Sequence, residues 1–344
     1  MVAQQDAPTT SHPAVAGRRP RVFSGMQPSG NLHLGNYLGA LRNWVRQQDG
    51  ADNVFCVVDL HALSLPTDPN ELRANSLELA TTFLAAGIDP ARTILFVQSD
   101  VREHTEAQWL LASVTQFGEL RRMTQFKDKS DGRDDVSAAL FTYPVLQAGD
   151  ILLYDTDSVP VGEDQKQHVE ITRDIAHRFN SRYGETFVLP KADIKPEGAR
   201  IMALDNPLKK MSKSSTTPAG LISLVDEPDA IRKKVRRAVT DSGSEVRGGP
   251  DKPALNNLLT IYSLLADRSV ADIEASYEGK GYGAFKTDLA EVVVEQLTPI
   301  RERLGDLNAH PDEVRRILRD GADRARAIAA PKLDTMRDRM GLGA

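Results

Sequence analysis

The chain has 344 residues, enough for about two domains and a sizeable buried core. Its 40% apolar and 26% charged residues are an ordinary globular composition. The net charge of −5 excludes a general basic field for nucleic acid, and the single cysteine, Cys56, excludes an intrachain disulfide or a cysteine metal cluster.

No apolar run approaches membrane-spanning length, so we expect no membrane partner. Residues 1–20 have neither a signal-peptide core nor periodicity, and they are interpreted as a loose N-terminal tail. These features predict a cytoplasmic protein.

The segment from Arg21 to Asn36 predicts a strand, a glycine loop and the start of a helix. The apolar pair Val22 and Phe23 comes before a stretch of turn-forming residues, and helical periodicity begins at Tyr37. Such a loop directs backbone N–H groups and a helix N-terminus at one point, which suits a phosphate. An ordinary strand-to-helix turn is the alternative.

The chain then alternates between strands and helices as far as Gly118. Strands are expected at 54–58 and 94–97, and helices at about 69–86 and 103–117, the first with Asp68 as its N-cap. The alternation predicts an α/β fold with a doubly wound parallel sheet. Ligands bind at the carboxyl ends of the strands in such a fold, where His61 and Gln98 fall.

Residues 119–140 are interpreted as a charged connection, and Pro144 as the start of the next helix. Asp150 lies within this otherwise apolar helix, and a buried carboxylate is costly unless a donor satisfies it. A distant Arg or Lys could supply that donor. A ligand N–H or ammonium is the functional alternative, and both remain open.

Residues 157–165 predict a strand, a turn and a helix N-terminus, with Asp164 as a plausible N-cap. Their spacing does not match a Ca²⁺ loop, whereas Gly162 and free backbone N–H groups could hold sugar hydroxyls. His168 is expected to pack or hydrogen-bond locally. No dedicated metal site is expected.

A second phosphate-binding element is expected at 207–215, where three lysines and several small hydroxyl residues lie in one short run. A basic surface loop is the alternative. From Asp226 onward the chain is predicted to be helical, with a Gly/Pro/Ser linker at 241–253 and a basic first helix that carries Arg232 and Arg237.

Together these motifs resemble those of the class I aminoacyl-tRNA synthetases. His-Leu-Gly-Asn at 33–36 is similar to the first signature, HIGH, and Lys-Met-Ser-Lys-Ser at 210–214 matches the second, KMSKS. Segments 25–30 and 162–168 resemble stretches typical of the bacterial tryptophan-specific branch. The likeness extends from Arg21 to Gly343. Asn36 replaces the second histidine of HIGH, and Gln147 stands where an apolar residue is usual.

The resemblance implies a Rossmann-like catalytic domain at 21–210 with a connective and dimerisation insertion around 119–155. It also implies a helical anticodon-binding region at 211–344, which begins with the mobile signature loop. The implied reaction activates L-tryptophan with Mg²⁺-bound ATP and then transfers it to its tRNA. Mg²⁺ would arrive with ATP, and the enzyme would work as a homodimer that does not bind DNA.

The resemblance also assigns residues to each part of the site. Lys210, Lys213 and Lys129 would meet the departing pyrophosphate. The positions that would hold ATP are Gln27, Pro28, Ser29, Gly35, Asn36, Gly162, Glu163, Asp164, Ile201, Met202, Lys210, Met211, Ser212, Lys213 and Ser214. Asp150 would accept the indole N–H. The other residues around the amino acid would be Phe23, His61, Tyr143, Gln147, Val159, Val161 and Gln165.

Three other functions compete with this one. A tyrosine-specific synthetase shares a buried aspartate but typically pairs it with a tyrosine. A related adenylyltransferase that does not use tRNA would not need the long helical C-terminal region. A non-catalytic RNA-binding relative would not need the lysines at 210 and 213.

Overall fold

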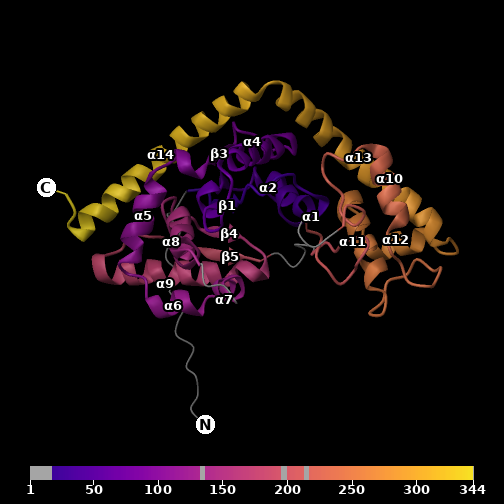
Figure 1. Cartoon of the computed structure of the whole chain (residues 1–344), viewed down its shortest axis with the longest axis horizontal. Coiled ribbons are helices and arrows are strands. Elements are labelled where there is room, and N and C mark those ends of the chain that lie inside the picture. The colour runs from indigo at the N-terminus through magenta and orange to yellow at the C-terminus, as the bar shows by residue number, and fades with distance from the viewer. Residues whose placement is uncertain (1–17, 132–135, 195–199, 213–216, 344) are drawn as a thin grey trace, which may run out of the picture.

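The computed structural model describes residues 18–131, 136–194, 200–212 and 217–343. A five-stranded sheet forms its centre, in the order β3-β2-β1-β4-β5, and neighbouring strands of this sheet are parallel. The strands are β1 (Arg21–Met26), β2 (Asp52–Val57), β3 (Thr93–Val97), β4 (Ser158–Pro160) and β5 (Lys191–Asp193). The predicted doubly wound parallel sheet is therefore confirmed (Figure 1).

Helices cover both faces of this sheet because its strands are apolar on both sides. On β2, Phe55 and Val57 join one buried cluster, whereas Val54 and Cys56 join the other. The helices on the N-terminal side of residue 200 are α1 (Leu34–Asn36), α2 (Arg42–Gln47), α3 (Asp59–Ala62), α4 (Pro69–Ala85), α5 (Glu103–Ala112), α6 (Phe117–Arg122), α7 (Thr124–Ser130), α8 (Ala138–Leu152) and α9 (Lys166–Tyr183). A π-helical turn, η1 (Tyr37–Leu41), joins α1 to α2, and two 3₁₀ turns are η2 (Gln98–Asp100) and η3 (Glu163–Gln165).

Several predicted boundaries are confirmed, and others are wrong. Asp68 caps α4 by accepting the N–H groups of Asn70 and Glu71, as expected. The helix expected at 103–117 ends instead at Ala112, and the described part of the charged connection is largely helical. Pro144 lies inside α8, whose N-cap is Ser137.

The C-terminal half is helical, as expected. Its elements are α10 (Pro228–Arg237), α11 (Pro253–Ala266), α12 (Val270–Ser276), α13 (Tyr282–Ala309) and α14 (Pro311–Met340). Figure 1 shows α13 and α14 as two long helices that meet at an angle and arch over the sheet. None of the helices in the described part of the chain has the length and apolar character that a membrane span requires.

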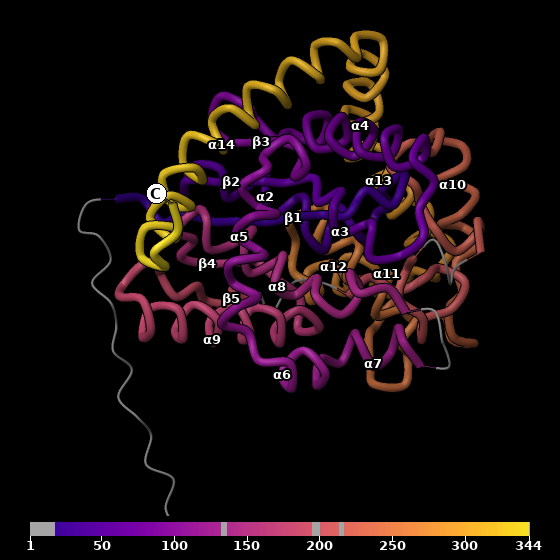
Figure 2. The backbone as a smooth tube through the Cα atoms, turned by 60° about the vertical axis from the view of Figure 1, so that its left-hand side comes forward, coloured from indigo at the N-terminus to yellow at the C-terminus, as the bar shows by residue number. Residues whose placement is uncertain are grey.

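The last helix returns to the sheet, and Figure 2 shows α14 beside β3 from a second direction. Arg324 of α14 donates to the carbonyl of Pro90 at 2.7 Å, just before β3. Gly321 lies so close to β3 that a β-carbon there would overlap the Leu95 carbonyl. Segment 311–343, assigned above to the helical region, therefore packs on the part assigned to the catalytic domain.

Candidate active site

A cavity of about 360 Å³ lies at the carboxyl ends of β1 and β4. Strand order reverses between these two strands, so a crevice opens there in a doubly wound sheet. Its walls also include residues from α3, α7 and α8. The lining residues are Phe23, Ser24, Gly25, Met26, Gln27, Ala40, Trp44, Val58, His61, Ser64, Gln125, Lys129, Tyr143, Gln147, Asp150, Ile151, Val159, Pro160, Val161, Gly162 and Gln165.

Asp150 is the most buried charged group in this lining, at 1% exposure. Its Oδ2 accepts from Nε2 of His61 at 2.7 Å, and its Oδ1 accepts from Nδ1 of His104 and Nε2 of Gln98, both at 2.6 Å. Burial alone would raise the pKa of Asp150, but the hydrogen bonds from His104 and His61 hold it well below its usual range. The carboxylate is therefore ionised, and its donors are two histidines and a glutamine rather than the distant Arg or Lys considered from the sequence.

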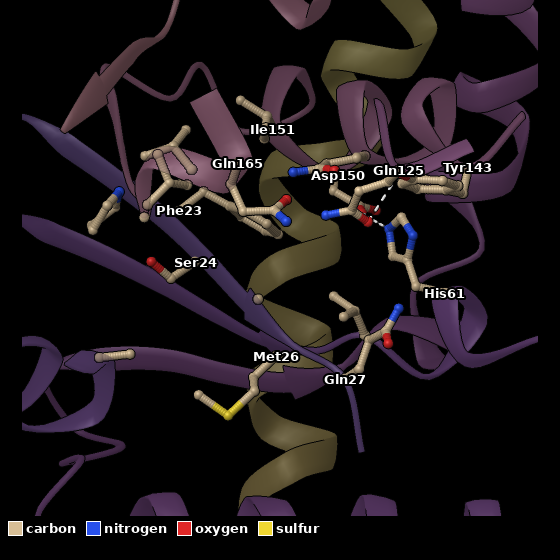
Figure 3. Close-up of a pocket in the computed structure, with 18 of the residues that line it drawn as sticks. Phe23, Ser24, Met26, Gln27, His61, Gln125, Tyr143, Asp150, Ile151 and Gln165 are labelled. Atoms are coloured by element: carbon tan, nitrogen blue, oxygen red, sulfur yellow. Dashed lines mark hydrogen bonds and ion pairs between the residues drawn. The ribbon is translucent and has the colours of Figure 1, made fainter. Parts of the chain in front are cut away.

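A second polar group lies near this carboxylate. The Tyr143 hydroxyl is 2.6 Å from Nε2 of His168 and donates to Oε1 of Gln125 at 3.3 Å, and Nζ of Lys129 lies 5.9 Å from the Tyr143 ring centre. Figure 3 shows Gln125, Tyr143, Asp150 and His61 close together at one end of the pocket. Burial raises the pKa of Tyr143 to about 12, so its hydroxyl stays protonated at neutral pH. The expected local hydrogen bond of His168 is present.

The structure brings all eight expected amino-acid residues to one cavity, together with part of the expected nucleotide set. The members found in its lining are Phe23, Gln27, His61, Lys129, Tyr143, Gln147, Asp150, Val159, Val161, Gly162 and Gln165. The expected residues outside this lining are Pro28, Ser29, Gly35, Asn36, Glu163, Asp164, Ile201, Met202, Lys210, Met211 and Ser212. Lys213 and Ser214 lie outside the described residues.

The two signature segments meet next to this cavity's strand β1. The backbone N–H of Leu34 donates to the carbonyl of Ile222 at 2.9 Å, and the N–H of Leu224 donates to the carbonyl of Leu32 at 3.1 Å. The segment that follows the second signature therefore pairs with the first signature. His33 caps α1 through its ring nitrogen, and Asn36 completes a capping box by accepting the His33 N–H.

A short hairpin carries Lys210. The N–H of Met211 donates to the carbonyl of Ile201 at 2.9 Å, and Met202 pairs with Lys210 across an antiparallel bridge. From α11, Asn257 holds both backbone groups of Met202: its Oδ1 accepts the N–H at 2.8 Å, and its Nδ2 donates to the carbonyl at 3.0 Å. An adenine that accepted the Met202 N–H would have to displace Oδ1 of Asn257, whereas the Met202 carbonyl has a second lone pair to offer.

Asp164 does not cap the helix as expected. It lies inside η3, whose N-cap is Gly162, and α9 begins after Gln165. A β-carbon on Gly162 would come 2.7 Å from Oδ1 of Asp164, so the loop closes tightly at this glycine. The acidic side chains of this turn have other partners: Oε1 of Glu163 lies 3.8 Å from Nζ of Lys166, and Oδ2 of Asp164 accepts from Nε2 of Gln165 at 3.4 Å.

The sequence reasoning missed some residues of the site. Those in the lining are Ser24, Gly25, Met26, Ala40, Trp44, Val58, Ser64, Gln125, Ile151 and Pro160. His104 and Gln98, which bind Asp150, were not assigned to the site either. Gln98 could have been assigned from its position at the carboxyl end of a strand, because His61, which was assigned, lies at the end of the neighbouring strand. Within the described ranges, no group of three or more His, Cys, Asp or Glu side chains is arranged to hold a metal ion.

The comparisons with known proteins agree with this geometry. The family model described as "tRNA synthetases class I (W and Y)" matches residues 16–298. The tryptophan–tRNA ligase of Caldanaerobacter subterraneus subsp. tengcongensis is 54% identical over 323 residues, which are 94% of this chain and 98% of that protein. The corresponding ligase of Bacillus subtilis is 51% identical with the same coverage.

Solved structures of similar proteins have the same fold. The tryptophanyl-tRNA synthetase of Mycoplasma pneumoniae matches with a TM-score of 0.85 at 37% identity, over 94% of this chain and 98% of that one. The Campylobacter jejuni enzyme, complexed with ADP and tryptophan, matches with a TM-score of 0.81 at 39% identity, over 94% and 100%. This chain therefore belongs to the class I tRNA synthetases of the tryptophan and tyrosine family.

Proposed function

We propose that this chain is a ligase that activates L-tryptophan with ATP and transfers it to the 3′ end of its tRNA. The relatives named above support the reaction, since they are tryptophan–tRNA ligases that align over nearly the whole chain. The observation that carries the choice of amino acid is the single buried carboxylate, Asp150, in the wall of a cavity otherwise lined largely by apolar and neutral polar groups. An indole has one N–H, which needs one such acceptor.

In the first step the tryptophan carboxylate attacks the α-phosphate of ATP and releases pyrophosphate. The attacking group is already ionised, so positioning and charge stabilisation are sufficient without a protein nucleophile. The residues proposed to hold ATP are Gln27, Pro28, Ser29, Gly35, Asn36, Gly162, Glu163, Asp164, Ile201, Met202, Met211, Ser212 and Ser214. Lys129, Lys210 and Lys213 are proposed to stabilise the departing pyrophosphate, and Mg²⁺ to enter bound to ATP.

The amino acid is proposed to lie with its indole N–H toward Asp150 and its ring against Phe23, Val159 and Val161. Its ammonium group would lie toward Tyr143 and Gln165, with His61 and Gln147 beside the ring. All of these side chains line the same cavity. In the second step a ribose hydroxyl of the tRNA terminus attacks the activated carbonyl. This activity places the protein in the cytoplasm.

Two macromolecular partners follow from the proposal. The helical region 211–344 would read the tRNA anticodon. The chain would form a homodimer through the surface around 119–155. That surface is supported by Phe117, just before this range, which is 69% exposed and whose ring centre lies 4.9 Å from that of Phe141 with the two rings tilted by 44°. Light scattering would measure the mass in solution, and Phe117→Glu should yield a monomer if this surface forms the dimer.

ATP–pyrophosphate exchange with each of the twenty amino acids tests the proposal. Exchange should depend on tryptophan, and purified tRNA should then be charged with it. Exchange with tyrosine alone would identify the tyrosine-specific alternative. Exchange without tRNA charging would identify an adenylyltransferase, and no exchange with any amino acid would leave only an RNA-binding role.

A further inference from the structure

A buried polar chain leads away from the cavity behind Asp150. Oδ1 of Asp150 is 2.6 Å from Nδ1 of His104, and Nε2 of His104 is 2.8 Å from the hydroxyl of Tyr154. Both His104 and Tyr154 are 0% exposed and neither lines the cavity, so neither can touch a substrate there. Three buried polar groups interact strongly in the low dielectric of the interior, so their hydrogen-bond pattern is tightly constrained.

Close packing of helices α5 and α8 brings the hydrogen-bonded groups of Asp150 and His104 together. Gly149 of α8 lies opposite α5, where a β-carbon would come 3.4 Å from the His104 carbonyl and 3.5 Å from Cβ of Ala107. A β-carbon would just fit at this position, so a side chain larger than a methyl group would push the helices apart. Because Gly149 directly precedes Asp150, the same contact sets the distance between the carboxylate and His104.

The hydrogens in the hydrogen-bonded series Asp150, His104 and Tyr154 can be assigned by counting donors and acceptors. In a neutral imidazole one nitrogen donates and the other accepts. Nδ1 of His104 faces a carboxylate, which only accepts, so it must carry the hydrogen. Nε2 must then accept, and the Tyr154 hydroxyl donates to it. Burial raises the pKa of Tyr154 well above its usual value, so this hydroxyl keeps its hydrogen.

The acceptor capacity of Asp150 is nearly filled. A carboxylate offers about four lone-pair positions. His61, Gln98 and His104 use three of them in the described structure. One position is left for a ligand, and its direction depends on the orientation in which the three donors hold the carboxylate. Figure 3 shows Asp150 and His61 joined in this way at the pocket wall.

We propose that His104 and Tyr154 are positioning residues that set selectivity for an indole N–H by orienting the free acceptor position of Asp150. The inference rests on the proposed function, in which Asp150 accepts that N–H. Tyr154 acts on His104 by donating to Nε2 and so holding the ring in one orientation, and His104 acts on the carboxylate. If the imidazole turned, a carbon atom of the ring would replace Nδ1 beside Oδ1, and the hydrogen bond to the carboxylate would be lost.

The experiment compares L-tryptophan with its benzothiophene analogue, in which sulfur replaces the indole N–H. The ratio of the two kcat/KM values in pyrophosphate exchange measures selectivity for the N–H, and a general loss of stability would not change this ratio. In His104→Leu, which removes a hydrogen bond to the carboxylate, the ratio should fall by about tenfold, and in Tyr154→Phe, which removes a hydrogen bond between neutral groups, by about fivefold. Tyr262→Phe, which removes a buried hydroxyl bonded to Tyr277 at 3.2 Å, is the matched control and should leave it unchanged.

A double-mutant cycle separates the two residues. The amide nitrogen of Asn can take the place of Nδ1 and has no tautomer, so His104→Asn should keep most of the selectivity. Tyr154→Phe should then have no further effect in the His104→Asn background, whereas alone it lowers the ratio. If His104→Leu does not fold, Tyr154→Phe and this cycle still decide the question.

An unchanged ratio in active Tyr154→Phe and His104→Leu variants would overturn the positioning role and leave the proposed function intact. Equal effects of Tyr154→Phe in both backgrounds would overturn the link through His104. A wild-type protein that does not exchange pyrophosphate with tryptophan would overturn the proposed function and this inference together.

Discussion

Gly35 and Met211 lie next to each other in space, although they are far apart in the sequence. A β-carbon on Gly35 would come 3.5 Å from Cβ of Met211, and 3.0 Å from Nδ1 of His33. The backbone of the first signature thus lies against the second signature, and the His33 ring is what leaves little room for a side chain at position 35. The two expected phosphate-binding segments are neighbours in space.

Gly35→Ala should raise the KM for ATP about tenfold with little change in stability. The new methyl group would crowd the His33 ring, which caps α1, while it would meet Met211 at ordinary contact distance. Alanine also favours the helix by up to about 1 kcal/mol, which offsets part of the strain. Pyrophosphate exchange at varied ATP measures the effect. Gly283→Ala, which meets nothing within 4 Å, is the control, and an unchanged KM in Gly35→Ala would contradict the prediction.

Asn257→Leu should lower the rate of adenylate formation about tenfold. It removes both hydrogen bonds to the backbone of Met202, each contributing about 1 kcal/mol, and leaves the hairpin of Lys210 without its support from α11. Single-turnover measurement of adenylate formation tests this. Thr260→Val alters the same helix at a hydroxyl bonded to the Asn256 carbonyl and should have no such effect. Equal rates for Asn257→Leu and wild type would show that the two hydrogen bonds from Asn257 to Met202 do not position Lys210.

The sequence predicted features that depend on local interactions. The Asp68 cap is an example, because its acceptor and donors lie within three residues of one another. The parallel sheet was also predictable, since alternating strands and helices leave few other arrangements. His61 and Gln98 could be placed at strand ends and therefore near a ligand, and both prove to bind Asp150.

Features that depend on packing between distant segments were not predictable. The sequence offered no donor for Asp150 from α5, because the distance from His104 depends on how closely α5 and α8 approach at Gly149. Periodicity likewise predicted a helix near the C-terminus but not the surface that α14 covers. The hydrogen bonds between Asn257 and Met202 join two segments that are distant in the sequence, and no local pattern predicts their pairing.

Asp150→Ala should raise the KM for tryptophan far more than the KM for ATP. It should also destabilise the fold by about 3 kcal/mol, since His61, His104 and Gln98 would lose their acceptor in a buried site. Because these hydrogen bonds hold the pKa of Asp150 low, its stabilising contribution is complete above the unfolded pKa near 4 and decreases as the solution becomes more acid. Exchange kinetics and urea unfolding measure the two effects, and equal losses for both substrates would count against the assigned role.

His168 should make the protein less stable at mildly acid pH. Burial and the nearby charge of Lys129 lower the pKa of His168 to about 4, whereas an unfolded histidine titrates near 6.5. Between these values the unfolded chain binds more protons, so stability is lost as the pH falls. From pH 7.5 to 5.0 this loss is about 2 kcal/mol.

His168→Gln should remove that part of the pH dependence, because its amide can still pair with the Tyr143 hydroxyl but does not titrate. Urea unfolding at pH 7.5 and 5.0 gives the comparison. His177→Gln, at an exposed position on the same helix, is the matched control and should retain the wild-type difference. If His168→Gln lost as much stability as wild type over this range, another group would be responsible.

Gly321→Ala and Gly305→Ala should change stability in opposite directions. A β-carbon on Gly321 would lie 1.8 Å from the carbonyl oxygen of Leu95, a backbone atom that β3 holds in place, so α14 would have to move away from the sheet. Such overpacking costs about 1–3 kcal/mol. Gly305 in α13 has nothing within 4 Å of the same position, so alanine there should stabilise the helix by up to about 1 kcal/mol. Urea unfolding measures both free energies. A gain in both variants would mean that α14 is not anchored to β3 at Gly321.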